Sequence, residues 1–309
     1  MSTLAPRTKV GRLPTFLIVG GMKCGTTALY RYLQAHPDVY MPAVKAPEFF
    51  VEEANWGRGV DWYRRMFAGA PPDAVAIGEA SNAYTKYPTF RGVPERIAAH
   101  LPDVRMIYAV RDPIDRIRSH YQTRVWQGDE RAPIETAVFD DPRYVAYSRY
   151  GMQLERYLAC FPRERILVIT SEALRNDRVA TLRRVLSFVG ADAEVVPDNA
   201  DREFYRSGDH ARSSLVPLRV RKALKRHLPA AKRGKELENR LFRALDVVRG
   251  RPAAPPRAPV TMPDDVRARL ASLLDDDVRR LRELVGPAVD AWGLGDSRGG
   301  SRGDTPDAR

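Results

Sequence analysis

The sequence of 309 residues contains little cysteine and no long apolar run. Only Cys24 and Cys160 are present, too few for the disulfide framework that stabilises small secreted domains. No apolar stretch approaches the roughly 20 residues that a membrane-spanning helix needs, and the apolar part of the N-terminal segment is too short for a signal peptide. These absences lead us to expect a cytoplasmic protein without a transmembrane segment.

The charge of the sequence is strongly positive, and much of the excess lies in one segment. The chain carries 51 Lys and Arg residues against 39 Asp and Glu, a formal net charge of +12. Residues 219–251 contain twelve Lys or Arg and only three acidic residues, and they lack the interleaved aromatic side chains typical of nucleic-acid binding. We expect a solvated helical segment here, with contact to an anionic acceptor or a membrane surface as the alternative, and no nucleic-acid partner.

Short apolar strands alternate with amphipathic helices along the first two thirds of the sequence. Strands are expected at 16–21, 74–80, 105–112 and 165–171, and helices from Thr26 to the HPD sequence at 36–38 and at 94–101, 113–127, 150–161 and 179–190. Such alternation is typical of a parallel sheet covered by helices. The sequence therefore predicts an α/β fold with a central parallel sheet.

One domain accounts for most of the chain. A last amphipathic helix, with apolar residues at helical spacing from Val266 to Leu284, is expected to pack back onto the α/β core. The expected boundaries are a flexible N-terminus at 1–13, a domain at 14–295 with a basic helical insertion at about 217–250 and a proline-rich connector at 251–263, and a disordered tail at 296–309.

The stretch GGMKCGTT at 20–27 follows the first apolar strand and begins the first helix. Its glycines allow a tight turn that brings backbone N–H groups and the positive end of the helix to one anion, so a phosphate is the expected ligand. The stretch differs from the nucleotide-binding loop of NTPases, because Thr26 stands where that loop has its lysine and Lys23 lies inside the turn. A γ-phosphate and its magnesium ion would therefore lack their usual partners.

A second basic element, YAVRDPIDRIRSHY at 108–121, follows the third expected strand. Arg111 comes directly after the strand, Pro113 opens a helix, and Ser119 lies two turns into that helix. An arginine and a serine so placed can converge on one phosphate, to which the guanidinium contributes charge-assisted hydrogen bonds. The sequence thus predicts two separate anion sites.

Both elements resemble motifs of sulfotransferases that use 3′-phosphoadenosine 5′-phosphosulfate (PAPS). MKCGTT is similar to their 5′-phosphosulfate loop, K-x-G-T-T, and RDPIDRIRS is similar to their 3′-phosphate element, R-D-P-x-x-R-x-x-S. Similarity to bacterial and heparan-sulfate-type sulfotransferases extends over roughly residues 14–190. The resemblance implies a P-loop-type three-layer sandwich, PAPS as the co-substrate and no metal.

The resemblance also implies roles for individual residues. The implied cofactor-binding residues are Lys23, Cys24, Gly25, Thr26, Thr27, Arg111 and Ser119. The first five belong to the 5′-phosphosulfate loop and the last two to the 3′-phosphate element. Lys23 would also be catalytic, because it would contact the oxygen that bridges phosphorus and sulfur, where negative charge develops. Cys24 is expected to fill space rather than act as a nucleophile, since the chemistry needs no covalent intermediate.

The general base is the point at which this sequence departs from the family pattern. Many relatives place a glutamate in K-E-P-x-F-F to take the acceptor's proton, whereas this sequence reads KAPEFF at 45–50, with Ala46 at that position. In an extended segment Glu48 would face the same side as Ala46 and could act in its place. Glu79 and His120 are the other candidates, and we rank Glu48 first.

The remaining interpretations concern the acceptor and two rival functions. We expect sulfuryl transfer to a hydroxyl or amine of a small-molecule, lipid or glycan acceptor, and the sequence specifies neither the acceptor nor an oligomeric state. Arg206 or Arg212 lies at about the right place for a further basic element that grips the phosphosulfate in relatives. A metal-dependent P-loop kinase or NTPase is the first rival, and Thr26 argues against it. The second is a non-catalytic basic anion-binding protein, because Ala46 replaces the expected base.

Overall fold

The computed structural model describes residues 11–204 and 260–294 of the chain. Within these two ranges no helix is both long enough and apolar enough to cross a membrane. Predictions that fall outside the described residues concern most of the N-terminal segment 1–13, Arg206, Arg212, the basic insertion at 217–250, most of the connector 251–263 and the tail at 296–309.

Five parallel strands form one central sheet. They are β1 (Phe16–Gly20), β2 (Val39–Tyr40), β3 (Ala76–Ala80), β4 (Arg105–Val110) and β5 (Ile166–Thr170). Their order across the sheet is β2-β3-β1-β4-β5, and every neighbouring pair is parallel. The four strands expected from the sequence are confirmed, whereas β2 has only two residues and so carries no readable pattern.

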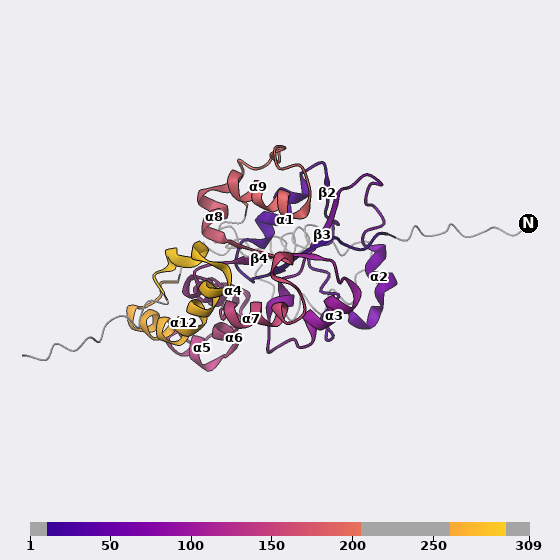
Figure 1. Ribbon diagram of the computed structural model, residues 1–309. Coiled ribbons are helices and arrows are strands. Elements are labelled where there is room, and N and C mark those ends of the chain that lie inside the picture. The colour runs from indigo at the N-terminus through magenta and orange to yellow at the C-terminus, as the bar shows by residue number, and fades with distance from the viewer. Residues whose placement is uncertain (1–10, 205–259, 295–309) are drawn as a thin grey trace, which may run out of the picture.

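Helices on both faces of the sheet complete the three layers that the sequence predicts. They are α1 (Thr26–Gln34), α2 (Val60–Arg65), α3 (Val93–His100), α4 (Pro113–Gln127), α5 (Ile134–Asp140), α6 (Arg143–Ala146), α7 (Tyr150–Leu158), α8 (Ser171–Asn176), α9 (Arg178–Val189) and α12 (Asp264–Val285), with 3₁₀ turns η1 (Trp56–Arg58), η2 (Asn82–Thr85), η3 (Arg163–Arg165) and η6 (Pro287–Trp292). In Figure 1, α1, α8 and α9 lie on one side of the strands and α3, α4 and α7 on the other. The longer helices are confirmed, whereas α2, α5, α6 and α8 have at most seven residues and were not predicted.

The order of the strands determines where a ligand can bind. β1 and β3 are buried at every position, as is typical of parallel strands that are covered on both faces. From β1 the chain turns toward β2 and β3 on one side, and from β4 it turns toward β5 on the other. The connections that leave these two neighbouring strands therefore diverge, and parallel α/β sheets bind their ligands at the carboxyl ends of such strands.

The last helix, α12, packs back onto the domain as predicted. Its apolar residues are divided between two clusters. Val278 and Leu281 join the main core, whereas Val266, Leu270 and Leu274 pack with residues of α4 and α5. The helix thus bridges the central sandwich and the helices beside it (Figure 1).

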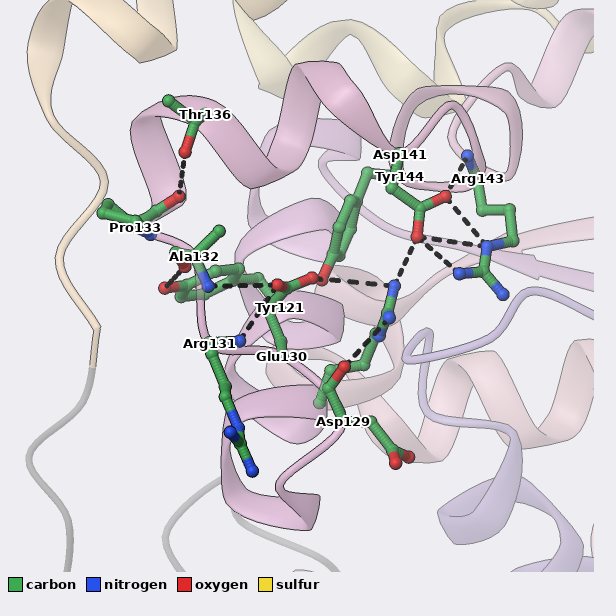
Figure 2. A network of polar contacts seen from close by, with 11 residues as sticks. Tyr121, Asp129, Glu130, Arg131, Ala132, Pro133, Thr136, Asp141, Arg143 and Tyr144 are labelled. Atoms are coloured by element: carbon green, nitrogen blue, oxygen red, sulfur yellow. Dashed lines mark hydrogen bonds and ion pairs between the residues drawn. The ribbon is translucent and has the colours of Figure 1, made fainter.

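A network of charged side chains fixes the far end of α4 (Figure 2). Arg124 on α4 forms ion pairs with Asp141 and with Glu130, the latter at 3.8 Å. Asp141 also pairs with Arg143 at 2.6 Å, and the Tyr144 hydroxyl donates to Glu130 at 3.1 Å. Because α4 begins at the second predicted anchor, this network holds the helix on which that anchor depends.

Candidate active site

The two predicted anion anchors lie side by side at the carboxyl end of the sheet. β1 and β4 are paired neighbours, the loop at 21–25 follows β1, and Arg111 follows β4. Ligands of parallel α/β sheets bind where the connections from adjacent strands diverge. The fold therefore brings together the two elements that the sequence singled out.

The turn after β1 provides backbone donors at the N-terminus of α1. Lys23, with a φ of 72°, and Gly25, with a φ of 84°, both adopt the left-handed conformation. Among the described residues, no acceptor is found for the N–H groups of Gly25, Thr26 and Thr27. Together with the positive end of the helix, these donors are suited to hold an anion.

Cys24 is enclosed within this turn. Its side chain is 0% exposed, its Sγ lies 3.5 Å from the Tyr150 hydroxyl, and its N–H donates to Gly21 O at 3.2 Å. Burial raises the pKa of the thiol to about 11, and the Tyr150 hydrogen bond opposes that shift. Cys24 thus remains a protonated thiol that packs the turn against α7.

Lys23 and Arg111 bring two positive charges together. Burial lowers the pKa of Lys23, and the charge of Arg111 is the next largest cause. The Arg111 side chain is 12% exposed and pairs with Asp115 at 3.3 Å, while its buried Nε has no partner within the described part of the chain. Ser119, two turns along α4, is buried. An anion bound between Lys23 and Arg111 would offset the repulsion between their charges. It would also accept a hydrogen bond from the unpaired Arg111 Nε.

Arg116 is a third cation, which the sequence analysis did not single out. It is completely buried, its Nε donates to Ser148 Oγ at 2.7 Å, and its Nη2 donates to Tyr144 O. Its Nη1 has no partner among the described residues, and its charge contributes to the lowered pKa of Lys23. Arg116 is the second arginine of the R-D-P-x-x-R motif, so the motif could have identified it. It was passed over because an arginine on a helix usually faces solvent.

The backbone around Glu48, the first candidate base, is not extended as predicted. Ala46, with a φ of 59°, and Glu48, with a φ of 51°, both adopt the left-handed conformation. The assumption that alternate residues share a face therefore does not apply, and that part of the prediction is wrong. Instead, the Glu48 N–H donates to Ser81 Oγ at 3.0 Å, which attaches the segment to the end of β3. The Glu48 side chain is half-buried.

Glu79, the second candidate base, is enclosed at the end of β3. Its side chain is 0% exposed, and its Oε1 accepts hydrogen bonds from the hydroxyls of Tyr84 at 2.7 Å and Tyr63 at 3.3 Å. Burial raises the pKa of Glu79 to about 7, and the charge of Glu48 adds to the shift. Its Oε2 is buried and has no hydrogen-bond partner among the described residues, so Glu79 is less accessible to a substrate than the half-buried Glu48.

His120, the third candidate, is also enclosed. It is 9% exposed, and its ring stacks on Tyr147 with centroids 6.1 Å apart. Burial lowers the pKa of His120 to about 2, and the charges of Arg116, Arg124 and Lys86 act in the same direction. The imidazole is therefore neutral and weakly basic, so Glu48 is the most accessible of the three candidates.

Lys86 stands next to Glu48 and was missed in the sequence. It follows η2, whose last residue, Thr85, donates to Val19 O at 3.2 Å, so Lys86 lies beside the end of β1. Burial lowers the pKa of Lys86, whereas the charge of Glu48 raises it. No motif marked this lysine in the sequence.

The parallel sheet and the glycine turn after its central strand define a P-loop-type α/β protein. The described residues contain no group of three or more His, Cys, Asp or Glu side chains placed to hold a metal ion. The family model described as the sulfotransferase domain matches residues 13–235, and the chain belongs to the sulfotransferase family. This membership does not favour either rival, the kinase or NTPase and the non-catalytic binding protein.

Similar proteins are known in humans and in bacteria. The chain is 30% identical over 198 residues to human bifunctional heparan sulfate N-deacetylase/N-sulfotransferase 3, with 58% of this chain and 22% of that protein covered. It is 32% identical over 213 residues to human heparan sulfate glucosamine 3-O-sulfotransferase 5, with 63% and 60% covered. A crystal structure of a sulfotransferase from Alicyclobacillus acidocaldarius superposes with a TM-score of 0.65 at 27% identity, covering 91% of this chain and 99% of that one. The chain thus spans less than two thirds of these curated relatives.

Proposed function

We propose that this protein transfers a sulfuryl group from PAPS to a hydroxyl or amine of a small-molecule, lipid or glycan acceptor. The observation that carries the proposal is the proximity of the Lys23 turn and the Arg111 anchor, each with polar donors that lack an acceptor among the described residues. Two separated anion sites match a nucleotide with a 3′-phosphate and a 5′-phosphosulfate. The heparan sulfate relatives favour a glycan among the acceptor classes.

The donor would be held at its two charged ends. The N–H groups of Gly25, Thr26 and Thr27 suit the 5′-phosphate, because they surround the positive end of α1. Arg111, with a vacant Nε, and Ser119 suit the 3′-phosphate. All of these contacts are made by backbone and cationic or hydroxyl groups, so we expect binding without Mg²⁺.

The transfer would proceed by in-line attack of the acceptor oxygen or nitrogen on sulfur. Glu48 would accept the proton of the attacking group while the bond between sulfur and the bridging oxygen breaks. Lys23 would stabilise the negative charge on that oxygen as adenosine 3′,5′-bisphosphate leaves. Lys86 would place a positive charge beside Glu48.

Calorimetric titration tests the donor assignment. Wild-type protein should bind adenosine 3′,5′-bisphosphate in the presence of EDTA and should prefer it to ATP with Mg²⁺. Arg111→Ala should weaken bisphosphate binding at least about tenfold, whereas Arg65→Ala, which removes an exposed charge on α2, should not. A preference for ATP with Mg²⁺ would refute the proposal in favour of the kinase alternative.

Turnover tests the acceptor class. The protein is incubated with PAPS and either desulfated heparan sulfate oligosaccharides or an extract of small metabolites and lipids, and products are followed by the mass gained with one sulfuryl group. We expect product in the glycan arm. Product only with the extract of small metabolites and lipids would show that the acceptor is not a glycan. Bisphosphate binding without any product would support the non-catalytic binding protein.

A further inference from the structure

Lys45 contacts the turn that binds the anion, although no motif in the sequence marks it for that role. Its Nζ lies 2.6 Å from the Oγ1 of Thr27, in the first turn of α1. An ammonium group can only donate, so the Thr27 oxygen is the acceptor in this contact. The Thr27 hydroxyl hydrogen therefore remains available to a second acceptor, and the neighbouring positive charge makes it a stronger donor.

Lys45 adds a cation beside the N-terminus of α1. This end of the helix carries the positive end of the helix dipole, where anions are stabilised. Lys23, in the turn before α1, and Arg111 place two further positive charges near this point. Three cations at a helix N-terminus suit a ligand with more than one negative charge.

The segment 45–48, here called the bridge, is held at both ends by hydrogen bonds. Beyond the Lys45 contact with Thr27, Asn55 Nδ2 donates to Pro47 O at 2.7 Å and the Glu48 N–H donates to Ser81 Oγ at 3.0 Å. Within this bridge Ala46 and Glu48 keep left-handed conformations, which are costly for residues with a side chain and are commonly retained at functional sites. Residues 45–48 thus connect the donor turn to the end of β3.

We propose that Lys45 binds the 5′-phosphate end of the donor together with the Thr27 hydroxyl. Donor binding would thereby fix the segment that presents Glu48 to the acceptor. The inference rests on the proposed function, since it assumes a nucleotide with a charged 5′ group in the crevice. It adds a residue from outside the glycine turn to that site, and it links the donor contact to the base across two intervening residues, Ala46 and Pro47.

Ligands that carry only one of the two phosphates give a direct test. Wild type, Lys45→Met, Lys45→Arg and Arg65→Ala are titrated with adenosine 3′,5′-bisphosphate, 5′-AMP and 3′-AMP. Lys45→Met should weaken the binding of the bisphosphate and of 5′-AMP at least about tenfold and leave the affinity for 3′-AMP unchanged. Lys45→Arg should recover part of the lost affinity. Arg65→Ala should match wild type for all three ligands. An equal loss for all three ligands, or no loss for 5′-AMP, would overturn the inference.

A double substitution separates a shared contact from independent effects. If Lys45 and Thr27 bind the same phosphate, their effects should not be independent. The double variant Lys45→Met with Thr27→Val should then lose less affinity for 5′-AMP than the product of the fold-losses measured for the two single variants. Losses that multiply would contradict a joint contact. Failure of wild-type protein to bind the bisphosphate would reject the proposed function itself, whereas normal wild-type binding that Lys45→Met leaves intact would reject only the role of Lys45.

Discussion

The Asp277 carboxylate on α12 accepts hydrogen bonds from the backbone N–H groups of Gly151 and Met152, each at 2.9 Å. It thereby caps α7 from a different helix. Gly151 permits this approach, because a Cβ there would lie 2.7 Å from Asp277 O. The residue before it, Tyr150, contacts Cys24 in the turn after β1, so a residue of the last helix helps to hold the turn that we propose binds the 5′-phosphate.

Removal of this cap should loosen the donor turn. Asp277→Ala should lower the free energy of unfolding by about 2 to 3 kcal/mol, since two N–H groups lose a charged acceptor. It should also increase the rate at which Cys24 reacts with a thiol reagent, while Cys160, which is half-exposed and outside the turn, serves as the internal reference. Asp276→Ala, at an exposed neighbouring position, is the control. Equal changes at both cysteines would indicate global unfolding instead.

Loss of the Glu48 carboxylate should affect turnover and spare donor binding. Glu48→Gln should lower kcat by about 10² to 10⁴, the usual contribution of a general base. Its affinity for adenosine 3′,5′-bisphosphate should match wild type, because the proposed role of the carboxylate is toward the acceptor and not toward the donor. Initial rates and calorimetry on the same preparation separate the two effects. Wild-type kcat in Glu48→Gln would remove Glu48 from the mechanism.

His120 should remain neutral at all pH values at which the protein is folded. Burial and three nearby cations lower the pKa of His120 to about 2, so its imidazole NMR signals should not shift between pH 5 and pH 8. His120→Gln should keep most of the activity if it folds. A His120 signal that titrates near pH 6.5 would restore His120 as a candidate base.

Glu79 should make the protein less stable as the pH rises. Burial raises the pKa of Glu79 from 4.5 to about 7, so the folded state binds this proton more tightly than the unfolded state. The stabilisation is present below about pH 4.5 and is lost as the pH rises toward 7, by at most about 3 kcal/mol. Glu79→Gln should remove this dependence in denaturant unfolding at pH 5 and pH 8, whereas the exposed Glu53→Gln should retain it.

The parts of the site that the sequence predicted are local along the chain. The turn from Lys23 to Thr27 and the pair Arg111 and Ser119 each follow one strand and begin one helix, so their residue types and spacing are sufficient to identify them. The order of the strands then brings the two elements together. The same local periodicity identified four of the five strands and the longer helices.

The features that the sequence did not predict depend on contacts between distant segments. Lys45 reaches Thr27, and Asp277 reaches Gly151, only after the chain has folded. The left-handed backbone at Ala46 and Glu48 could not be foreseen either, because neither residue type favours that conformation. It is held by tertiary hydrogen bonds to the segment, such as the bond from the Glu48 N–H to Ser81.

The cap on α7 also affects the order in which the site is completed during translation. Asp277 lies 126 residues after Gly151, and a ribosome adds roughly 5 to 20 residues per second. The turn at 21–25 therefore leaves the ribosome many seconds before Asp277, which helps to hold it through α7, is synthesised. A chain that stalls before α12 would contain every residue of both proposed donor motifs but lack this support for the turn, so a nascent protein should gain its affinity for nucleotide late.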